Sequence, residues 1–142
     1  MNVKKVTLLV GLPGSGKTTV GNFFIEKHNT IGKGIFIDDI GVLTQDAKSY
    51  LLNIDKEIDY IIISDVYFCK EKVLQAAKNL IIEIFSNVEV EILYFENNPE
   101  KCLYNVKERE KNGDNRKVDG LIKLLSKDYN VSTEKVIKIK NR

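Results

Sequence analysis

The sequence contains no long apolar run, few cysteines and little net charge, and each of these shortages excludes a class of protein. No apolar stretch approaches the roughly 18 residues that a membrane-spanning helix needs, so we expect no membrane partner. The two cysteines, Cys69 and Cys102, lack the spacing of a metal site; a disulfide between them stays open, but reduced thiols in a cytoplasmic protein are the expected state. A net charge of +2 gives no general affinity for polyanions.

Residues 11–18 read Gly-Leu-Pro-Gly-Ser-Gly-Lys-Thr and match the whole phosphate-loop pattern G-x-x-x-x-G-K-[ST]. The glycines permit backbone conformations that turn consecutive N–H groups toward an anion. Lys17 is placed to reach the β- and γ-phosphates of a nucleoside triphosphate, and the Thr18 hydroxyl is placed to ligate Mg²⁺. The residues that we expect to bind ATP are Gly11, Pro13, Gly14, Ser15, Gly16, Lys17, Thr18 and Thr19.

The context of this motif supports the interpretation against a glycine-rich turn that binds nothing. An apolar, β-prone run at 6–10 precedes it, and a helix-compatible stretch at 18–28 follows it. Strand, loop and helix in this order is the arrangement that a phosphate loop requires. A cleaved signal peptide would remove the loop, so we expect none.

The rest of the chain alternates strand and helix patterns. Five segments have the composition of strands, at 3–10, 34–38, 60–65, 88–95 and 135–139. Amphipathic helical patterns lie at 70–86 and around 121–129, and Pro99 stands where a helix can begin. Repeated strand–helix units require right-handed crossovers, and these produce a parallel sheet. We therefore expect a single α/β domain over residues 1–142, a three-layer sandwich whose five-stranded parallel sheet carries helices on both faces.

Acidic residues follow two of the predicted strands, and ligands in such sheets bind at the carboxyl ends of strands. Asp38 and Asp39 end the second strand, and Asp65 ends the third. Beside a phosphate loop such an acid holds Mg²⁺ directly or through water, or accepts a proton as a general base. We assign the base to Asp38, with Asp39 as the alternative base, acceptor binding to Asp39 and Asp65, and a metal role to Asp65 together with Thr18. A helix N-cap is the alternative for each aspartate.

The basic residues concentrate late in the chain, where two of its three arginines bracket one polar stretch. Arg109 and Arg116 stand on either side of the glycine-containing segment 111–115, which predicts a loop between two helices. Such a loop can close over phosphates, and a mobile arginine commonly stabilises the charge on a transferred phosphoryl group. We therefore assign both arginines catalytic roles, with surface placement as the alternative.

Taken together, these motifs resemble the P-loop kinases typified by the kinase domain of phage polynucleotide kinase, a group of small kinases that includes the zeta-toxin type. The resemblance rests on residues 11–19, Ile-Asp-Asp at 37–39, Ile-Ile-Ile-Ser-Asp at 61–65, and Cys-Leu-Tyr-Asn at 102–105 followed by Arg109. It implies ATP and Mg²⁺ as cofactors, Asp38 as the base that deprotonates a 5′-hydroxyl, and a late arginine on phosphate. This chain departs from the family on the acceptor side, at Gly41, at Val66-Tyr67 and at Tyr104.

Three functions remain open at this stage. The leading hypothesis is a kinase that transfers the γ-phosphoryl group of ATP to a hydroxyl of a nucleic acid, nucleotide or nucleoside. A kinase for a small sugar-type metabolite and an ATP-binding regulatory module are the alternatives. The lysine alternation at 135–140 fits an edge strand or a nucleic-acid contact, and we favour the edge strand.

Overall fold

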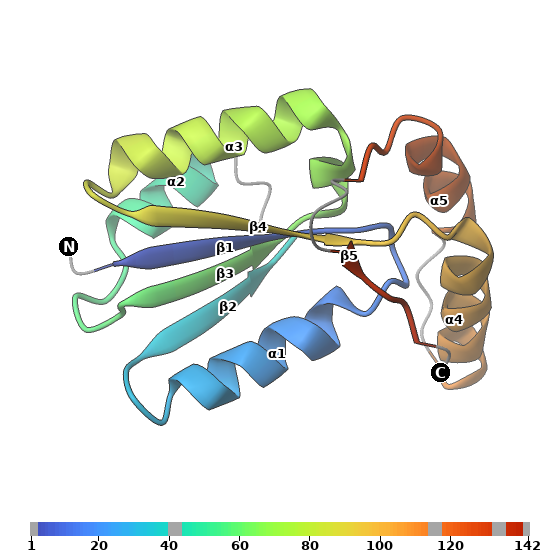
Figure 1. The fold of residues 1–142 in the computed structure, drawn as a ribbon, viewed down its shortest axis with the longest axis horizontal. Helices are drawn as coiled ribbons and strands as arrows, with labels where there is room; N and C mark the ends of the chain where they lie inside the picture. The colour runs from blue at the N-terminus through green and yellow to red at the C-terminus, as the bar shows by residue number, and fades with distance from the viewer. Residues whose placement is uncertain (1–2, 40–43, 114–117, 132–135, 141–142) are drawn as a thin grey trace.

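The computed structural model describes residues 3–39, 44–113, 118–131 and 136–140. Its five strands form one parallel sheet in the order β2-β3-β1-β4-β5, shown in Figure 1. The strands are β1 (Lys5–Val10), β2 (Gly34–Asp38), β3 (Tyr60–Ser64), β4 (Glu89–Phe95) and β5 (Val136–Ile137). The predicted α/β fold with a five-stranded parallel sheet is confirmed, and β5 lies at the edge as expected.

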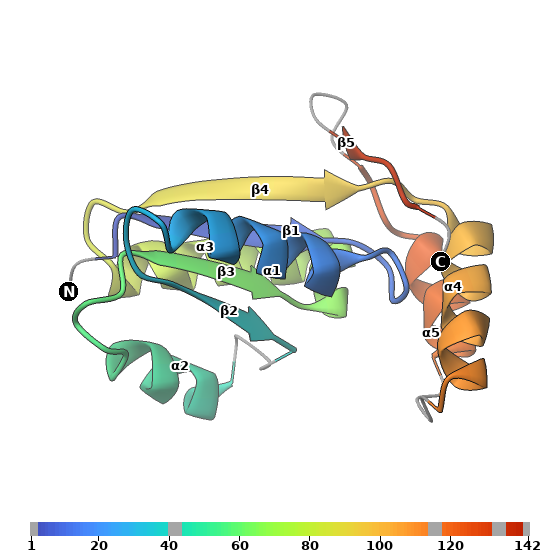
Figure 2. The same cartoon turned by 90° about the horizontal axis from the view of Figure 1, so that it is seen from below.

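Helices lie on both faces of this sheet and beyond its carboxyl edge. α1 (Lys17–His28) covers one face, and α2 (Gln45–Leu52) and α3 (Glu71–Ile84) lie on the other (Figures 1 and 2). α4 (Pro99–Lys111) and α5 (Asp119–Ser126) stand side by side past the carboxyl ends of the strands. A short 3-10 helix, η1 (Val66–Cys69), follows β3. No helix within the described ranges has both the length and the apolar character to cross a membrane.

The sequence patterns missed one helix and overstated one strand. α2 escaped notice because its eight residues bury only Ala47 and Leu51, although Thr44 caps it by accepting a hydrogen bond from the Ala47 N–H at 3.2 Å. β5 pairs over only two residues, and Lys135 lies outside the described residues. The apolar run 35–37 predicted a strand covered on both faces. β2 lies at the edge of the sheet, and both of its faces are covered: Ile37 is buried in the cluster on the α3 side, and Phe36 packs against the cluster on the α1 side.

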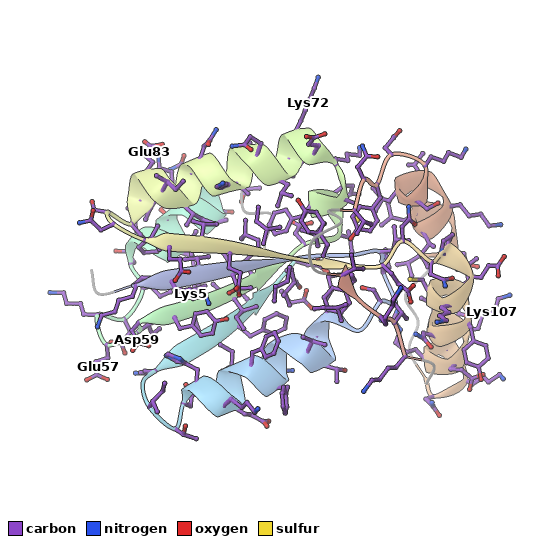
Figure 3. All side chains as sticks on the ribbon, in the orientation of Figure 1. Lys5, Glu57, Asp59, Lys72, Glu83 and Lys107 are labelled. Atoms are coloured by element: carbon purple, nitrogen blue, oxygen red, sulfur yellow. The ribbon has the colours of Figure 1, made fainter. Side chains whose placement is uncertain are left out.

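The core consists of two apolar clusters, one on each side of the sheet. Alternate residues of β1 enter different clusters: Leu8 faces the α3 side, and Leu9 faces the α1 side. The central position of β1 explains why both are fully buried. On α3, Leu74, Ala77 and Ile81 pack toward the sheet, whereas most of the exposed residues are charged or polar, including the labelled Lys72 and Glu83 in Figure 3.

Tyr129, which follows α5, ties the helices at the carboxyl edge to the sheet. Its buried hydroxyl lies 2.9 Å from the carbonyl oxygen of Val10 and 2.5 Å from that of Phe95, at the ends of β1 and β4. Burial raises the pKa of Tyr129, so the hydroxyl keeps its proton and remains a donor. This side chain therefore fixes where α5 stands relative to the two strands.

We expect Tyr129→Phe to lower the free energy of unfolding by about 1–3 kcal/mol, because the carbonyls of Val10 and Phe95 lose the one hydroxyl hydrogen that they share. The matched control is Tyr104→Phe, since the Tyr104 side chain is exposed, and its effect should stay within about 0.5 kcal/mol. Urea denaturation of both variants measures the difference. Equal stabilities would show that the Tyr129 hydroxyl does not anchor α5.

Candidate functional site

The glycine-rich loop, residues 11–18, leaves the carboxyl end of the central strand β1 and enters α1. Gly14 and Gly16 adopt left-handed conformations, with φ of 84° and 97°, which other residues adopt only at a cost. Gly14 also has no room for a side chain, because an added Cβ would lie 2.6 Å from the Cys102 carbonyl oxygen of α4. The loop thus sits in the middle of the carboxyl edge, between the N-terminus of α1 and the side of α4.

Lys17, the first residue of α1, folds back over this loop. Its ammonium group donates hydrogen bonds to the carbonyl oxygens of Gly11 at 2.8 Å and Leu12 at 2.9 Å, and the residue is buried. Burial lowers the pKa of Lys17, while the neighbouring acidic groups oppose that shift. The cation is therefore held at the loop by dipoles and by charges of opposite sign.

Asp38, at the end of β2, connects two neighbouring segments through its carboxylate. One oxygen accepts a hydrogen bond from the Ser64 hydroxyl of β3 at 2.6 Å, and the other accepts a longer one from the Thr18 hydroxyl at 3.4 Å. The contact with Thr18 brings the acid predicted at the end of β2 to the hydroxyl predicted to ligate Mg²⁺. Strand order explains this proximity, because only β3 separates β2 from β1.

Asp39 continues the same acidic edge in an unusual backbone conformation. Its φ of 49° is left-handed, and its N–H donates to the Ser64 carbonyl at 2.8 Å. Partial removal from water raises the pKa of Asp39, Asp38 and Asp65 raise it further, and Lys17 lowers it. A strained residue whose carboxylate faces other carboxylates is typical of a functional site.

Asp65 has a structural role that the sequence had left as an alternative. It is 7% exposed, and its carboxylate accepts a hydrogen bond from the Tyr67 N–H at 2.9 Å, which caps η1. Burial raises the pKa of Asp65, and the bond from Tyr67 opposes that shift. Neither Asp38 nor Asp39 is the N-cap residue of a described helix, although a backbone hydrogen bond from Val66, the first residue of η1, lowers the pKa of Asp39.

The loop opens into a cavity of about 770 Å³ that most of the predicted site residues line. Predicted residues in its wall are Pro13, Gly14, Ser15, Gly16, Lys17, Thr18, Thr19, Asp38, Asp39 and Arg109. Gly11 and Asp65 are not in the wall, although Gly11 contributes the carbonyl that Lys17 contacts. Arg109 reaches the cavity from the last turn of α4. Arg116 lies outside the described residues.

The cavity wall also contains residues that the sequence analysis did not assign to the site. Phe23 and Phe24 of α1 and Ile137 of β5 supply apolar surface, and Lys138 and Lys140 supply positive charge. Because β5 lies two strands from β1 on the side away from β2, these lysines and the aspartates flank the loop on opposite sides. Phe23 is 50% exposed, although its side chain is large and apolar. The available signals in the sequence were the adjacent Phe23 and Phe24 and the lysine alternation at 135–140.

The oxygen atoms at the acidic edge fit Mg²⁺ only as part of a shared coordination shell. Within the described ranges, no group of three or more His, Cys, Asp or Glu side chains is arranged to hold a metal ion by itself. Mg²⁺ usually takes one or two protein ligands and completes its shell with water and substrate phosphates. The Thr18 hydroxyl suits that pattern as a direct protein ligand, whereas Asp65 lies outside the cavity wall and would act through water.

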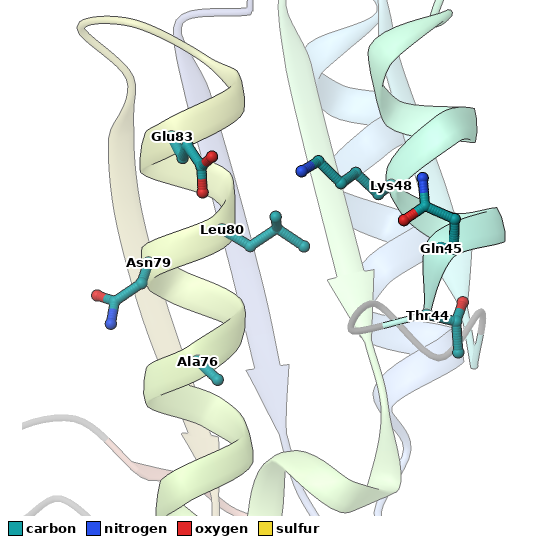
Figure 4. A pocket seen from close by; sticks show the side chains of 7 residues that line it. All are labelled: Thr44, Gln45, Lys48, Ala76, Asn79, Leu80 and Glu83. Atoms are coloured by element: carbon teal, nitrogen blue, oxygen red, sulfur yellow. The ribbon is translucent and has the colours of Figure 1, made fainter.

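A second cavity, of about 380 Å³, lies between α2 and α3 and is separate from this site (Figure 4). Its wall includes Lys48 of α2 and Leu80 and Glu83 of α3. None of the predicted site residues lines it, so we place the candidate site at the glycine-rich loop.

Comparisons with known proteins define the fold but not the activity. The chain is 26% identical over 133 residues to "Uncharacterized protein R277" of Acanthamoeba polyphaga mimivirus, and the match covers 92% of this chain and 89% of that protein. A solved structure described as "Crystal structure of APE1195" is 14% identical with a TM-score of 0.60, covering 99% of this chain and 87% of that one. No protein-family model matches.

We expect Gly14→Ala to destabilise the fold more than Gly113→Ala, although both glycines have positive φ. At Gly113, with φ 95°, an added Cβ meets nothing within 4 Å. The loss of stability there is therefore only the cost of holding a residue with a Cβ at positive φ, about 1–2 kcal/mol. At Gly14 the Cβ also meets the Cys102 carbonyl, and α4 must move. Chemical denaturation compares the two variants, and equal losses would contradict the close packing of α4 on the loop.

We expect Asp65→Asn to stabilise the protein at pH 7, because the folded state disfavours the ionised carboxyl and the amide oxygen can still cap η1. The raised pKa means that the folded state binds the proton more tightly than the unfolded state, so wild-type stability falls as pH rises through that pKa. The gain in the free energy of unfolding should vanish below pH 3.8, the ordinary pKa of an aspartate side chain. Unfolding curves between pH 3 and 7 measure it, and a gain independent of pH would contradict this cause.

Proposed function

We propose that this protein is an ATP-dependent P-loop kinase that transfers the γ-phosphoryl group to a hydroxyl of a nucleic acid, nucleotide or nucleoside. The observation that carries the proposal is the convergence of Lys17, Thr18, Asp38 and Arg109 on one cavity at the carboxyl end of β1. A loop of this sequence, a hydroxyl beside a carboxylate and a distal arginine are the parts that phosphoryl transfer requires.

In this proposal the loop binds the triphosphate of ATP. Its backbone N–H groups and the positive end of the α1 dipole attract the phosphates. Lys17 exchanges the carbonyls of Gly11 and Leu12 for oxygens of the β- and γ-phosphates, and this exchange keeps the buried ammonium fully hydrogen-bonded. Thr18, and Asp65 through water, would hold Mg²⁺, which neutralises charge on the phosphates.

The transfer step uses the acidic edge of the cavity. Asp38 takes the proton of the acceptor hydroxyl as its oxygen attacks the γ-phosphorus, and ADP leaves with the electrons of the broken P–O bond. The hydroxyls of Ser64 and Thr18 hold this carboxylate in position. Asp39 orients the acceptor, and the sequence assigns Asp65 the same acceptor role, although this residue is not in the cavity wall. Arg109 stabilises the charge that spreads over the transferred group. We assign Arg116 the same role on sequence grounds.

One observation favours a second candidate, a kinase for a small uncharged metabolite such as a sugar. The carboxylates of Asp38 and Asp39 dominate the side of the cavity toward β2, whereas Lys138 and Lys140 lie on the other side. A carboxylate edge attracts a neutral hydroxyl compound more readily than a polyanion. A regulatory module that binds ATP without transferring phosphate is the remaining alternative.

We place this activity in the cytoplasm. Both cysteines are buried and unpaired, and a reducing compartment suits free thiols. Burial raises the pKa of Cys69 to about 12 and that of Cys102 to about 11, so neither is a nucleophile at neutral pH.

We expect Lys17→Ala to lower the rate of phosphoryl transfer by at least about 10²–10³-fold, because a preorganised charge at the transferring group is lost. Transfer of labelled γ-phosphate from MgATP measures this on 5′-hydroxyl DNA and RNA, nucleosides, nucleoside monophosphates and sugars. The control is Lys72→Ala, on the outer side of α3, which should retain wild-type rates. Wild-type activity in the Lys17 variant would rule out this mechanism.

The acceptor panel also separates the alternatives. A polynucleotide acceptor predicts affinity that falls steeply with salt, because phosphate contacts release counterions. An uncharged metabolite predicts little dependence on salt. Label released as free phosphate, or ATP binding with no transfer to any acceptor, would favour the regulatory module.

A further inference from the structure

Asn105 joins three segments that are far apart in the chain. Its side chain projects from the middle of α4 and is 2% exposed. The amide nitrogen donates to the carbonyl oxygens of Gly14 and Lys140, both at 3.0 Å. An amide NH₂ carries two hydrogens, so one side chain serves both carbonyls. The glycine-rich loop, α4 and the end of the described chain therefore meet at one buried group.

On the loop side, the hydrogen bond from Asn105 to the Gly14 carbonyl sets the orientation of the peptide plane between Gly14 and Ser15. In a planar trans peptide, a carbonyl and the next N–H point in opposite directions. Holding the Gly14 carbonyl against α4 therefore directs the Ser15 N–H away from α4, and that N–H donates to the Leu12 carbonyl at 3.2 Å. Gly14 needs such a restraint, because a glycine with φ of 84° has many other conformations available.

On the other side, Asn105 restrains the C-terminal segment, residues 138–140. The strand that precedes this segment pairs with β4 over two residues only, so the sheet alone holds it weakly. Asn105 binds the Lys140 carbonyl, and the Glu96 carboxylate accepts from the Ile139 N–H at 2.9 Å. These two anchors keep Lys138 and Lys140 in the wall of the cavity that the loop opens into.

The geometry points to Asn105 as a positioning residue of the nucleotide site: it holds the loop in its anion-binding conformation and keeps the charges of Lys138 and Lys140 beside the bound triphosphate. This role rests on the proposed function, since it presupposes that the cavity takes a polyphosphate. Asn105 acts through the loop and the C-terminal segment, and the two lysines are themselves binding residues.

The test compares two asparagines of the same chemistry in the full chain. Asn97 also donates its side-chain amide to two backbone carbonyls, those of Ser126 at 2.9 Å and Tyr129 at 3.3 Å, but it lies outside the cavity wall. Calorimetric titration with MgATP and with inorganic tripolyphosphate gives dissociation constants for each variant. We expect Asn105→Ala to weaken both ligands by about tenfold and Asn97→Ala to leave both within about twofold.

A coupling measurement separates positioning from general destabilisation. Lys138→Ala together with Lys140→Ala should weaken tripolyphosphate binding in the wild-type background and have a smaller effect in the Asn105→Ala background, where the segment is no longer held. Asn105→Asp has the shape of asparagine but offers no N–H at neutral pH, so it should bind no more tightly than Asn105→Ala. Equal lysine effects in both backgrounds would overturn the coupling.

Hydrogen exchange of the wild-type protein tests the role without any variant, in case Asn105→Ala does not fold. Tripolyphosphate should slow exchange in residues 12–16 and 136–140 together, and protection of the loop alone would overturn the proposal. Unchanged affinity in folded Asn105→Ala, or equal losses in the Asn97 and Asn105 variants, would also overturn it. A wild-type protein that binds neither ligand overturns the proposed function, and this role with it.

Discussion

The architecture depends on β1, which is buried on both faces in the middle of the sheet. Each residue from Val6 to Val10 enters a packed environment, so the strand cannot shift without disrupting both apolar clusters. Its carboxyl end delivers the glycine-rich loop to the centre of the sheet edge, where strands on both sides contribute side chains. The rigidity of the site thus comes from hydrophobic packing beneath it, while its chemistry comes from the loops above.

The polar groups at this edge oppose one another in a way that costs stability. Burial disfavours the charged form of Lys17, and burial or neighbouring carboxylates disfavour the charged forms of Asp39 and Asp65. A chain selected only for folding would replace such groups with apolar ones. Their retention around one cavity, next to a residue with φ of 49°, is the physical reason to regard this edge as functional.

α4 and α5 complete the site from outside the sheet. Tyr129 attaches α5 to the ends of β1 and β4, and Asn105 attaches α4 to the loop. Both side chains use buried hydrogen bonds to backbone carbonyls, which constrain orientation more strictly than apolar contact does. α4 also carries Arg109, so the arginine proposed to act on the phosphoryl group lies on a helix that Asn105 fixes to the loop. The position of the Arg109 guanidinium therefore depends on the hydrogen bond that Asn105 makes to the loop as well as on Arg109 itself.

The amino-acid sequence determined the order of elements, the parallel sheet and the acidic residues at the strand ends, because local periodicity and glycine chemistry are properties of short segments. Short or weakly patterned elements, such as α2, left no comparable signal. The sequence also could not show that Asp65 caps η1 while Asp38 contacts Thr18, since both are acids at strand ends. Only tertiary structure brought Asn105, Lys138 and Lys140 to residues 11–18, because contacts between segments more than 90 residues apart depend on the strand order and not on any local pattern.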